Sequence, residues 1–103
     1  MALKIEVKKR FINSMEKVHE YLEKEWSTAV ADEFNRIADE KIKLISRQPD
    51  IGNVTAIANV RCVLAGRGYQ NRIYYRVIKD RLIIINMIDT RKNPKKNPFN
   101  KAV

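Results

Sequence analysis

The spacing of apolar residues changes twice along this 103-residue chain, and no other feature of the sequence constrains the fold as strongly. Apolar and charged residues alternate over residues 3–8, which is typical of a strand with one buried face. Between Phe11 and Ile45 the apolar residues recur every three or four positions, as they do on one side of an α-helix. After Gly52 the period of two returns. The chain is therefore predicted to form a strand, a helical region and a second group of strands.

Two helices with almost no loop between them are expected in the helical region. The apolar stripe of the first holds Phe11, Met15, Val18, Leu22 and Trp26, and Trp26 is expected in the core in preference to packing at the hairpin tip or holding a partner. The hydroxyl of Ser27 is suited to cap a second helix by accepting from an amide of its first turn. The buried stripe of that helix is predicted to hold Val30, Phe34, Ile37, Leu44 and Ile45, with Ala38 and Ile42 at its edge. Residues 48–52 then end the helix, because Pro49 cannot continue it and Gly52 permits a turn.

Three strands are expected after this αα-hairpin, at residues 60–64, 72–77 and 82–88. The third is nearly all apolar, as expected for an interior strand covered on both faces. Sequential, closely spaced strands usually pair as an antiparallel meander. The prediction is an α+β fold of order β-α-α-β-β-β, with the helical hairpin packed on an antiparallel sheet. A chain of this length is expected to be a single domain, residues 1–103, with a basic tail at about 91–103.

The positive charge lies entirely in the second part of the chain. Residues 1–59 carry ten Lys and Arg against ten Asp and Glu, whereas residues 60–103 carry eleven against two, which accounts for the whole net charge of +9. Such a field favours encounter with anionic partners, either nucleic acid or an acidic protein.

The remaining composition points to a cytoplasmic protein without a membrane segment. The single cysteine, Cys62, excludes an internal disulfide, and the N-terminal residues show no apolar leader. The longest aliphatic run, Leu82 to Ile85, is too short to cross a bilayer. No spacing of residues suggests a metal site, and no cofactor is expected.

Four short segments follow one another in a characteristic order: Tyr21–Ser27, Gln48–Gly52, Asn71–Val77 and Ile88–Pro94. With the predicted strand order, they resemble the RelE/ParE toxin superfamily of bacterial type II toxin–antitoxin systems, which includes plasmid stabilisation proteins. The first two segments look like the ParE-like branch in particular. The resemblance covers nearly the whole chain.

This resemblance implies two alternative activities. RelE-like members are metal-independent endoribonucleases that cleave mRNA, usually on the ribosome, whereas ParE-like members are associated with poisoning DNA gyrase and are not nucleases. Both are neutralised by a cognate antitoxin. For this chain we expect an acidic, amphipathic antitoxin segment to bind the basic face and an apolar groove of the helical hairpin. The sequence leaves a homodimer open.

The candidate phosphate-binding or target-binding residues are Arg61, Arg72, Tyr74, Arg76, Arg91, Lys92 and Lys95. Alternation places Arg72, Tyr74 and Arg76 on one face of a strand, and Arg61 is expected to join them because it points away from Cys62. Guanidinium groups bind phosphate through paired donors.

In the RelE-like nucleases, the positions of Arg61, Arg72 and Arg91 correspond to functional basic residues, so these three are the catalytic candidates if the protein is a ribonuclease. Two departures favour the ParE-like reading. Val63 stands where RelE-like enzymes have a second basic residue, and residues 95–100 contain no tyrosine. The order of hypotheses is therefore gyrase inhibition, then mRNA cleavage, then a non-toxic module that binds nucleic acid or the antitoxin.

Overall fold

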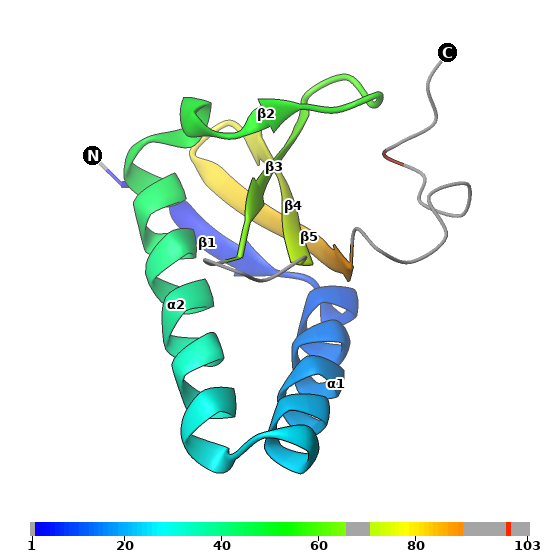
Figure 1. Ribbon diagram of the computed structural model, residues 1–103. Helices are drawn as coiled ribbons and strands as arrows, with labels where there is room; N and C mark the ends of the chain where they lie inside the picture. The colour runs from blue at the N-terminus through cyan, green and yellow to red at the C-terminus, as the bar shows by residue number, and fades with distance from the viewer. Residues whose placement is uncertain (1, 66–70, 90–98, 100–103) are drawn as a thin grey trace.

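The computed structural model describes residues 2–65, 71–89 and 99. The elements along the chain are β1 (Lys4–Val7), α1 (Lys9–Glu25), α2 (Thr28–Arg47), the 3₁₀ turn η1 (Pro49–Ile51), β2 (Asn53–Val54), β3 (Val60–Leu64), β4 (Asn71–Ile78) and β5 (Arg81–Asp89). The predicted order β-α-α-β-β-β is confirmed, with the short strand β2 as an addition. Figure 1 shows the two helices as a hairpin whose tip projects away from the sheet.

The five strands form one mixed sheet in the order β1-β5-β4-β3-β2. The meander β3 to β5 is antiparallel, as predicted, and β2 extends it by pairing antiparallel with β3. The exception is β1, which runs parallel to β5. Two further backbone bonds hold the ends of this pair, with Lys4 N donating to Asp80 O at 2.9 Å and Lys8 N to Ile84 O at 3.0 Å. The α+β fold is thus confirmed, while the sheet is antiparallel only in its C-terminal part.

The turn between the helices is very short and is held by a side-chain cap. The Ser27 hydroxyl accepts a hydrogen bond from Val30 N at 3.1 Å, as the sequence predicted. Trp26, by contrast, is 71% exposed at the hairpin tip, so the expectation that it packs in the core is wrong. The tip extends beyond the sheet, which leaves no partner in the described part of the chain to cover the indole (Figure 1).

The main core lies between the hairpin and one face of the sheet. It joins Phe11 and Leu22 of α1 and Phe34 and Ile45 of α2 to strand residues that include Ile73, Tyr75, Leu82, Ile84 and Met87.

The buried line of α2 differs from the predicted stripe. It runs through Ala31, Phe34, Ala38, Ile42 and Ile45, while Val30, Ile37 and Leu44 are only partly buried. Ala31 and Ala38 are the smallest side chains on this line, and they allow the helix backbone to approach the core closely. A buried stripe predicted from hydrophobicity alone therefore favours larger residues and misses how deeply these alanines are buried.

The β1 edge of the sheet is less covered than its alternating sequence suggested. Leu3 packs against the main core, but Ile5 and Val7 are both exposed. No helix in the described ranges combines the length and the apolar character needed to cross a membrane.

Candidate functional site

A second apolar cluster covers the face of the sheet opposite the helices. Its buried members are Val60, Cys62, Tyr74 and Phe99, with Ile85 and Ile88 packed against them. The rings of Tyr74 and Phe99 are stacked, with centroids 4.2 Å apart and planes inclined by 15°. Ala56 N also donates to Phe99 O at 3.1 Å. A residue from the C-terminal segment therefore covers the middle of this face.

Arg72 lies beside this cluster and lines a cavity of about 260 Å³. The other lining residues are Val54, Thr55, Ala56, Cys62, Tyr74 and Phe99. The guanidinium Nη1 lies 3.9 Å from Cys62 Sγ, a weak acceptor. The Nε atom is buried and has no hydrogen-bond partner among the described residues. The cavity thus combines apolar side chains with one cation whose buried Nε donor has no partner among the described residues.

Arg61 does not join Arg72, and the expectation that they share a face is wrong. In the β3–β4 register Arg61 is opposite Tyr75, whereas Cys62 is opposite Tyr74 and Leu64 is opposite Arg72. Residues paired in this way point to the same side of an antiparallel sheet. The Arg61 Nη1 atom donates instead to Gly52 O at 2.8 Å and to Asp50 O at 3.5 Å. It supports the turn after α2 rather than a phosphate site.

Of the other candidates, Arg76 is exposed and shares the Arg72 face, because it lies opposite Val60. It lies four positions along the strand from Arg72, which corresponds to about 13 Å. Tyr74, between them, is buried under Phe99 and is not available as a stacking platform in this arrangement. Arg91, Lys92 and Lys95 lie outside the described residues. The described arginines thus do not converge on one point.

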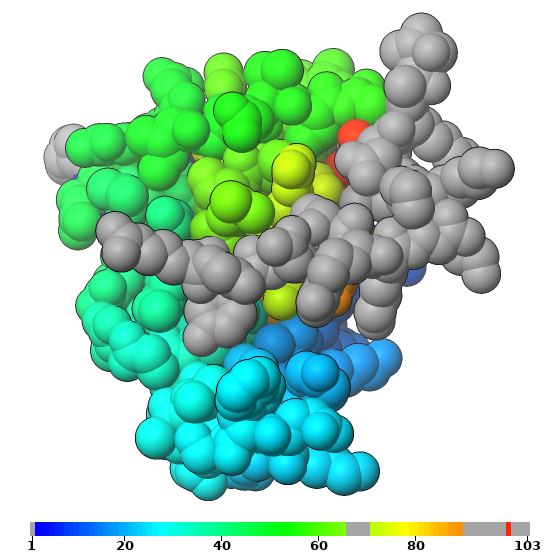
Figure 2. All heavy atoms as spheres, in the orientation of Figure 1, coloured from blue at the N-terminus to red at the C-terminus, as the bar shows by residue number. Residues whose placement is uncertain are grey.

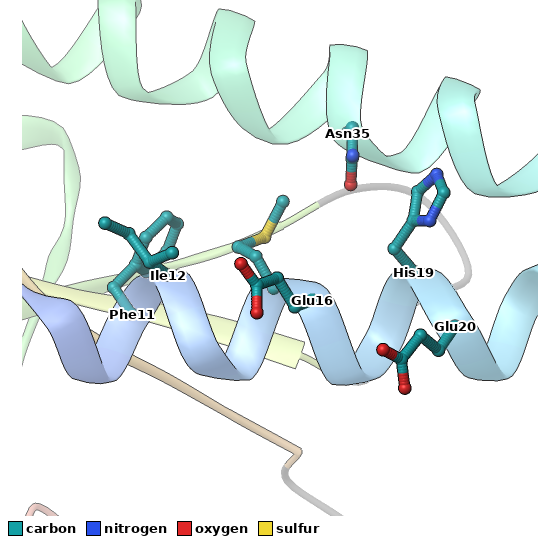
Figure 3. Close-up of a pocket in the computed structure, with 7 residues that line it drawn as sticks. Phe11, Ile12, Glu16, His19, Glu20 and Asn35 are labelled. Atoms are coloured by element: carbon teal, nitrogen blue, oxygen red, sulfur yellow. The ribbon is translucent and has the colours of Figure 1, made fainter.

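A second hollow, of about 380 Å³, lies between the helices. Figure 3 shows Phe11 and Ile12 at one end of it and His19 reaching toward α2 at the other. His19 Nε2 lies 3.1 Å from Asp32 Oδ1 and links the helices. The described lining includes the acidic residues Glu16 and Glu20 but no Lys or Arg, so the described part of this groove does not favour the acidic segment that was expected to occupy it.

The described ranges hold no group of three His, Cys, Asp or Glu side chains that could bind a metal ion. Figure 2 shows how the hairpin, in blue and cyan, forms one end of the molecule, while the region of β2, in green, forms the other. The Arg72 cavity belongs to the β2 side, since Val54 of that strand lines it.

Comparison with known proteins places this architecture in a family. The family model described as "ParE toxin of type II toxin-antitoxin system, parDE" matches residues 5–94. The chain belongs to the ParE toxin family. Among solved structures, a chain of the chromosomal ParDE TA system from P. aeruginosa is similar in fold. The TM-score is 0.75 at 10% identity, over 87% of this chain and 98% of that chain. A search of curated proteins found no match.

Membership of the ParE family gives this toxin a cognate antitoxin as its implied partner. The sequence did not single out Val54, Thr55, Ala56 or Phe99, although all four line the Arg72 cavity. One signal was available for Phe99, because it is an isolated aromatic in a charged, proline-containing segment. The positions of the other three depend on the β2 pairing, which the sequence did not reveal.

Proposed function

We propose that this ParE-family toxin arrests growth in the bacterial cytoplasm by inhibiting DNA gyrase, without catalysing a reaction, and that its cognate antitoxin neutralises it. The observation that carries the proposal is the placement of Arg61 and Arg72 on opposite faces of the sheet. Attack on a phosphodiester benefits from several cations preorganised around the charge that develops. On the Arg72 face of the described sheet, the Arg72 guanidinium lies amid apolar side chains, and Arg76 is about 13 Å away along the strand.

The exposed aromatic side chains at the hairpin tip support the proposal that the target is a protein. Trp26 is 71% exposed and Tyr21 is 58% exposed on the projecting end of the molecule. Aromatic side chains such as these dominate the energetics of many protein interfaces. We therefore assign the tip, defined by Tyr21 and Trp26, as the first surface to test for contact with gyrase.

A RelE-like mRNA endoribonuclease is the second candidate. Arg72 and Arg76 share one face of β4, which is the observation in its favour. On this alternative Arg72 and Arg91 would bind the reacting phosphate, and Arg61 would act only through the backbone of the turn. A non-toxic module that binds nucleic acid or the antitoxin is the third candidate.

Induced expression of the chain alone in a bacterial host tests the proposal, with DNA topology and mRNA integrity measured at early times. We expect trapped gyrase–DNA cleavage complexes and intact mRNA. Trp26→Ala should reduce the trapped complexes, while Ile57→Ala, which also truncates an exposed apolar residue, should not. Rapid mRNA cleavage that is lost in Arg72→Ala or Arg91→Ala would instead identify a ribonuclease. Normal growth with neither effect would identify the non-toxic module.

The antitoxin is proposed to present an acidic, amphipathic segment to the basic half of the toxin. The net charge of +9 carried by residues 60–103 should strengthen this association electrostatically. Affinity for the product of the neighbouring gene should therefore fall as salt rises from about 50 mM to about 500 mM. An affinity that does not respond to salt would contradict an electrostatic contribution.

A further inference from the structure

The guanidinium of Arg72 is incompletely satisfied in the described structure. Its Nε atom is buried without a hydrogen-bond partner, and Nη1 donates to the weakly accepting sulfur of Cys62 at 3.9 Å. Burying a charged donor without a partner is costly, so such groups normally meet an anion or another strong acceptor. None of the described residues that line the cavity beside Arg72 is acidic. The cavity therefore has the character of an anion site whose anion comes from another molecule.

The size and walls of this cavity define the ligand. At about 260 Å³ it is smaller than most pockets that enclose a whole small-molecule ligand. Its walls include Val54, Ala56 and the rings of Tyr74 and Phe99. Such a space suits one carboxylate at the end of a short aliphatic stem. The carboxylate would accept the paired N–H donors of the guanidinium, and the stem would contact the apolar walls.

A peptide fits this arrangement better than RNA does. Arg76 lies about 13 Å along the strand from Arg72, and Arg61 belongs to the other face. A nucleic acid backbone gains its affinity from several neutralised phosphates, whereas a side-chain carboxylate needs only one cation. Val54, at the sheet edge next to the cavity, is 75% exposed and offers apolar surface to the residues that flank such a carboxylate.

We infer that the cavity formed by Arg72, Cys62, Tyr74, Phe99 and β2 binds an Asp or Glu side chain of the antitoxin, flanked by apolar residues that cover Val54. This inference rests on the proposed antitoxin partnership. It adds the chemistry of the contact and its position on the toxin.

The site can be tested first with a probe that requires no antitoxin. Butyrate is added to the full-length, isotope-labelled toxin, and the side-chain Nε–H signals of the arginines are followed by NMR. We expect butyrate to shift the Arg72 signal, while the neutral isostere butyramide leaves it unchanged at the same ionic strength. The Arg76 signal serves as the internal control. Equal shifts with butyrate and butyramide, or no shift with either, would overturn the carboxylate site.

The alternative ligands give distinct results in the same experiment. Inorganic phosphate or a ten-nucleotide oligouridine that shifts the Arg72 signal more strongly than butyrate would overturn the peptide carboxylate in favour of a phosphate ligand. Because these measurements use the unmodified chain, they do not depend on whether a variant folds.

The antitoxin contact is tested by measuring the affinity of the full-length product of the neighbouring gene for wild-type toxin and two variants. Arg72→Gln should weaken binding by roughly tenfold to hundredfold, the usual effect of losing a charged hydrogen bond. Arg76→Gln removes the same charge from the same face and should weaken binding by less than about threefold. The affinity of Arg72→Lys should lie between those of Arg72→Gln and wild type, because lysine keeps the positive charge but lacks the paired donors of the planar guanidinium.

These affinities also separate the two hypotheses. Equal losses in Arg72→Gln and Arg76→Gln would overturn the specific site and leave the antitoxin partnership intact. A neighbouring gene product that does not bind wild-type toxin would overturn the antitoxin as the occupant, and the butyrate result would then decide the carboxylate site by itself.

Discussion

The phenol oxygen of Tyr75 lies 2.9 Å from the backbone nitrogen of Gly52 and accepts its hydrogen bond. The same hydroxyl donates to Pro49 O at 2.7 Å, so one side chain of β4 holds both ends of the turn after α2. The ring also occupies the space that a Cβ at position 52 would need. This contact fixes the end of the helical hairpin on the sheet and orients the chain into β2.

Gly52→Ala should destabilise the protein by about 2 kcal/mol, within the range for overpacking a filled site. The backbone at Gly52 has φ −74° and ψ 154°, which alanine adopts readily, so the cost is the clash with the Tyr75 ring and hydroxyl. Urea denaturation followed by circular dichroism gives the free energy of unfolding. Asn53→Ala, at the exposed next residue, is the control and should change this free energy by less than about 0.5 kcal/mol. An unchanged free energy of unfolding in Gly52→Ala would contradict the close approach of the Tyr75 ring to position 52.

Tyr75→Phe should lower the free energy of unfolding by about 1–2 kcal/mol, since it leaves the Gly52 N–H without its acceptor and removes the donor to Pro49 O. The same urea titration measures the loss. Tyr21→Phe removes a hydroxyl from an exposed tyrosine and should have little effect. Equal effects in the two variants would show that the buried hydroxyl does not stabilise the fold.

The stability of the wild-type protein should fall at high pH because of Tyr75. Burial is the main cause that raises the pKa of this phenol above its ordinary value of 10.0. As the pH passes the ordinary value, the unfolded chain loses this proton while the folded protein retains it. Linkage then makes unfolding more favourable. Between about pH 9 and pH 11, wild type should lose more stability than Tyr75→Phe. Equal losses of stability in the wild type and Tyr75→Phe would contradict the assignment of this pH dependence to Tyr75.

Phe99→Ala should lower the free energy of unfolding by about 3 kcal/mol, because it removes a buried ring and its stacking with Tyr74. Trp26→Ala removes a larger aromatic side chain that is exposed, and it should change stability by less than about 0.5 kcal/mol. Since Trp26 is absent from that control, urea unfolding of both variants is followed by circular dichroism. Comparable losses would mean that Phe99 contributes no more to stability than an exposed ring.

Ser27→Ala should cost about 1 kcal/mol, the usual effect of removing a helix cap. The Ser27 hydroxyl accepts from Val30 N, and the two helices are separated by only Trp26 and Ser27. Ser27→Asp keeps an acceptor at this position and should retain most of the stability. A loss in Ser27→Asp as large as that in Ser27→Ala, measured by urea unfolding, would contradict a capping role.

The sequence determined the local structure and the order of the elements. The change of apolar period located both helices and the strands β3, β4 and β5, and the Ser27 cap and the turn at residues 48–52 followed from the chemistry of single residues. These features depend on neighbours within a few positions, so a pattern along the chain is enough to find them. The order of elements and the short segments also indicated the toxin family before the fold was known.

Only the tertiary structure decided which side chains meet. Alternation gives two faces for each strand, but the pairing register decides which face of β3 matches which face of β4, and it separated Arg61 from Arg72. The same register placed Cys62 beside Arg72, and the tertiary structure brought Phe99 onto Tyr74. Contacts between residues distant in sequence are set by the packing of the whole domain, and a shift of one residue in the register would exchange the two faces.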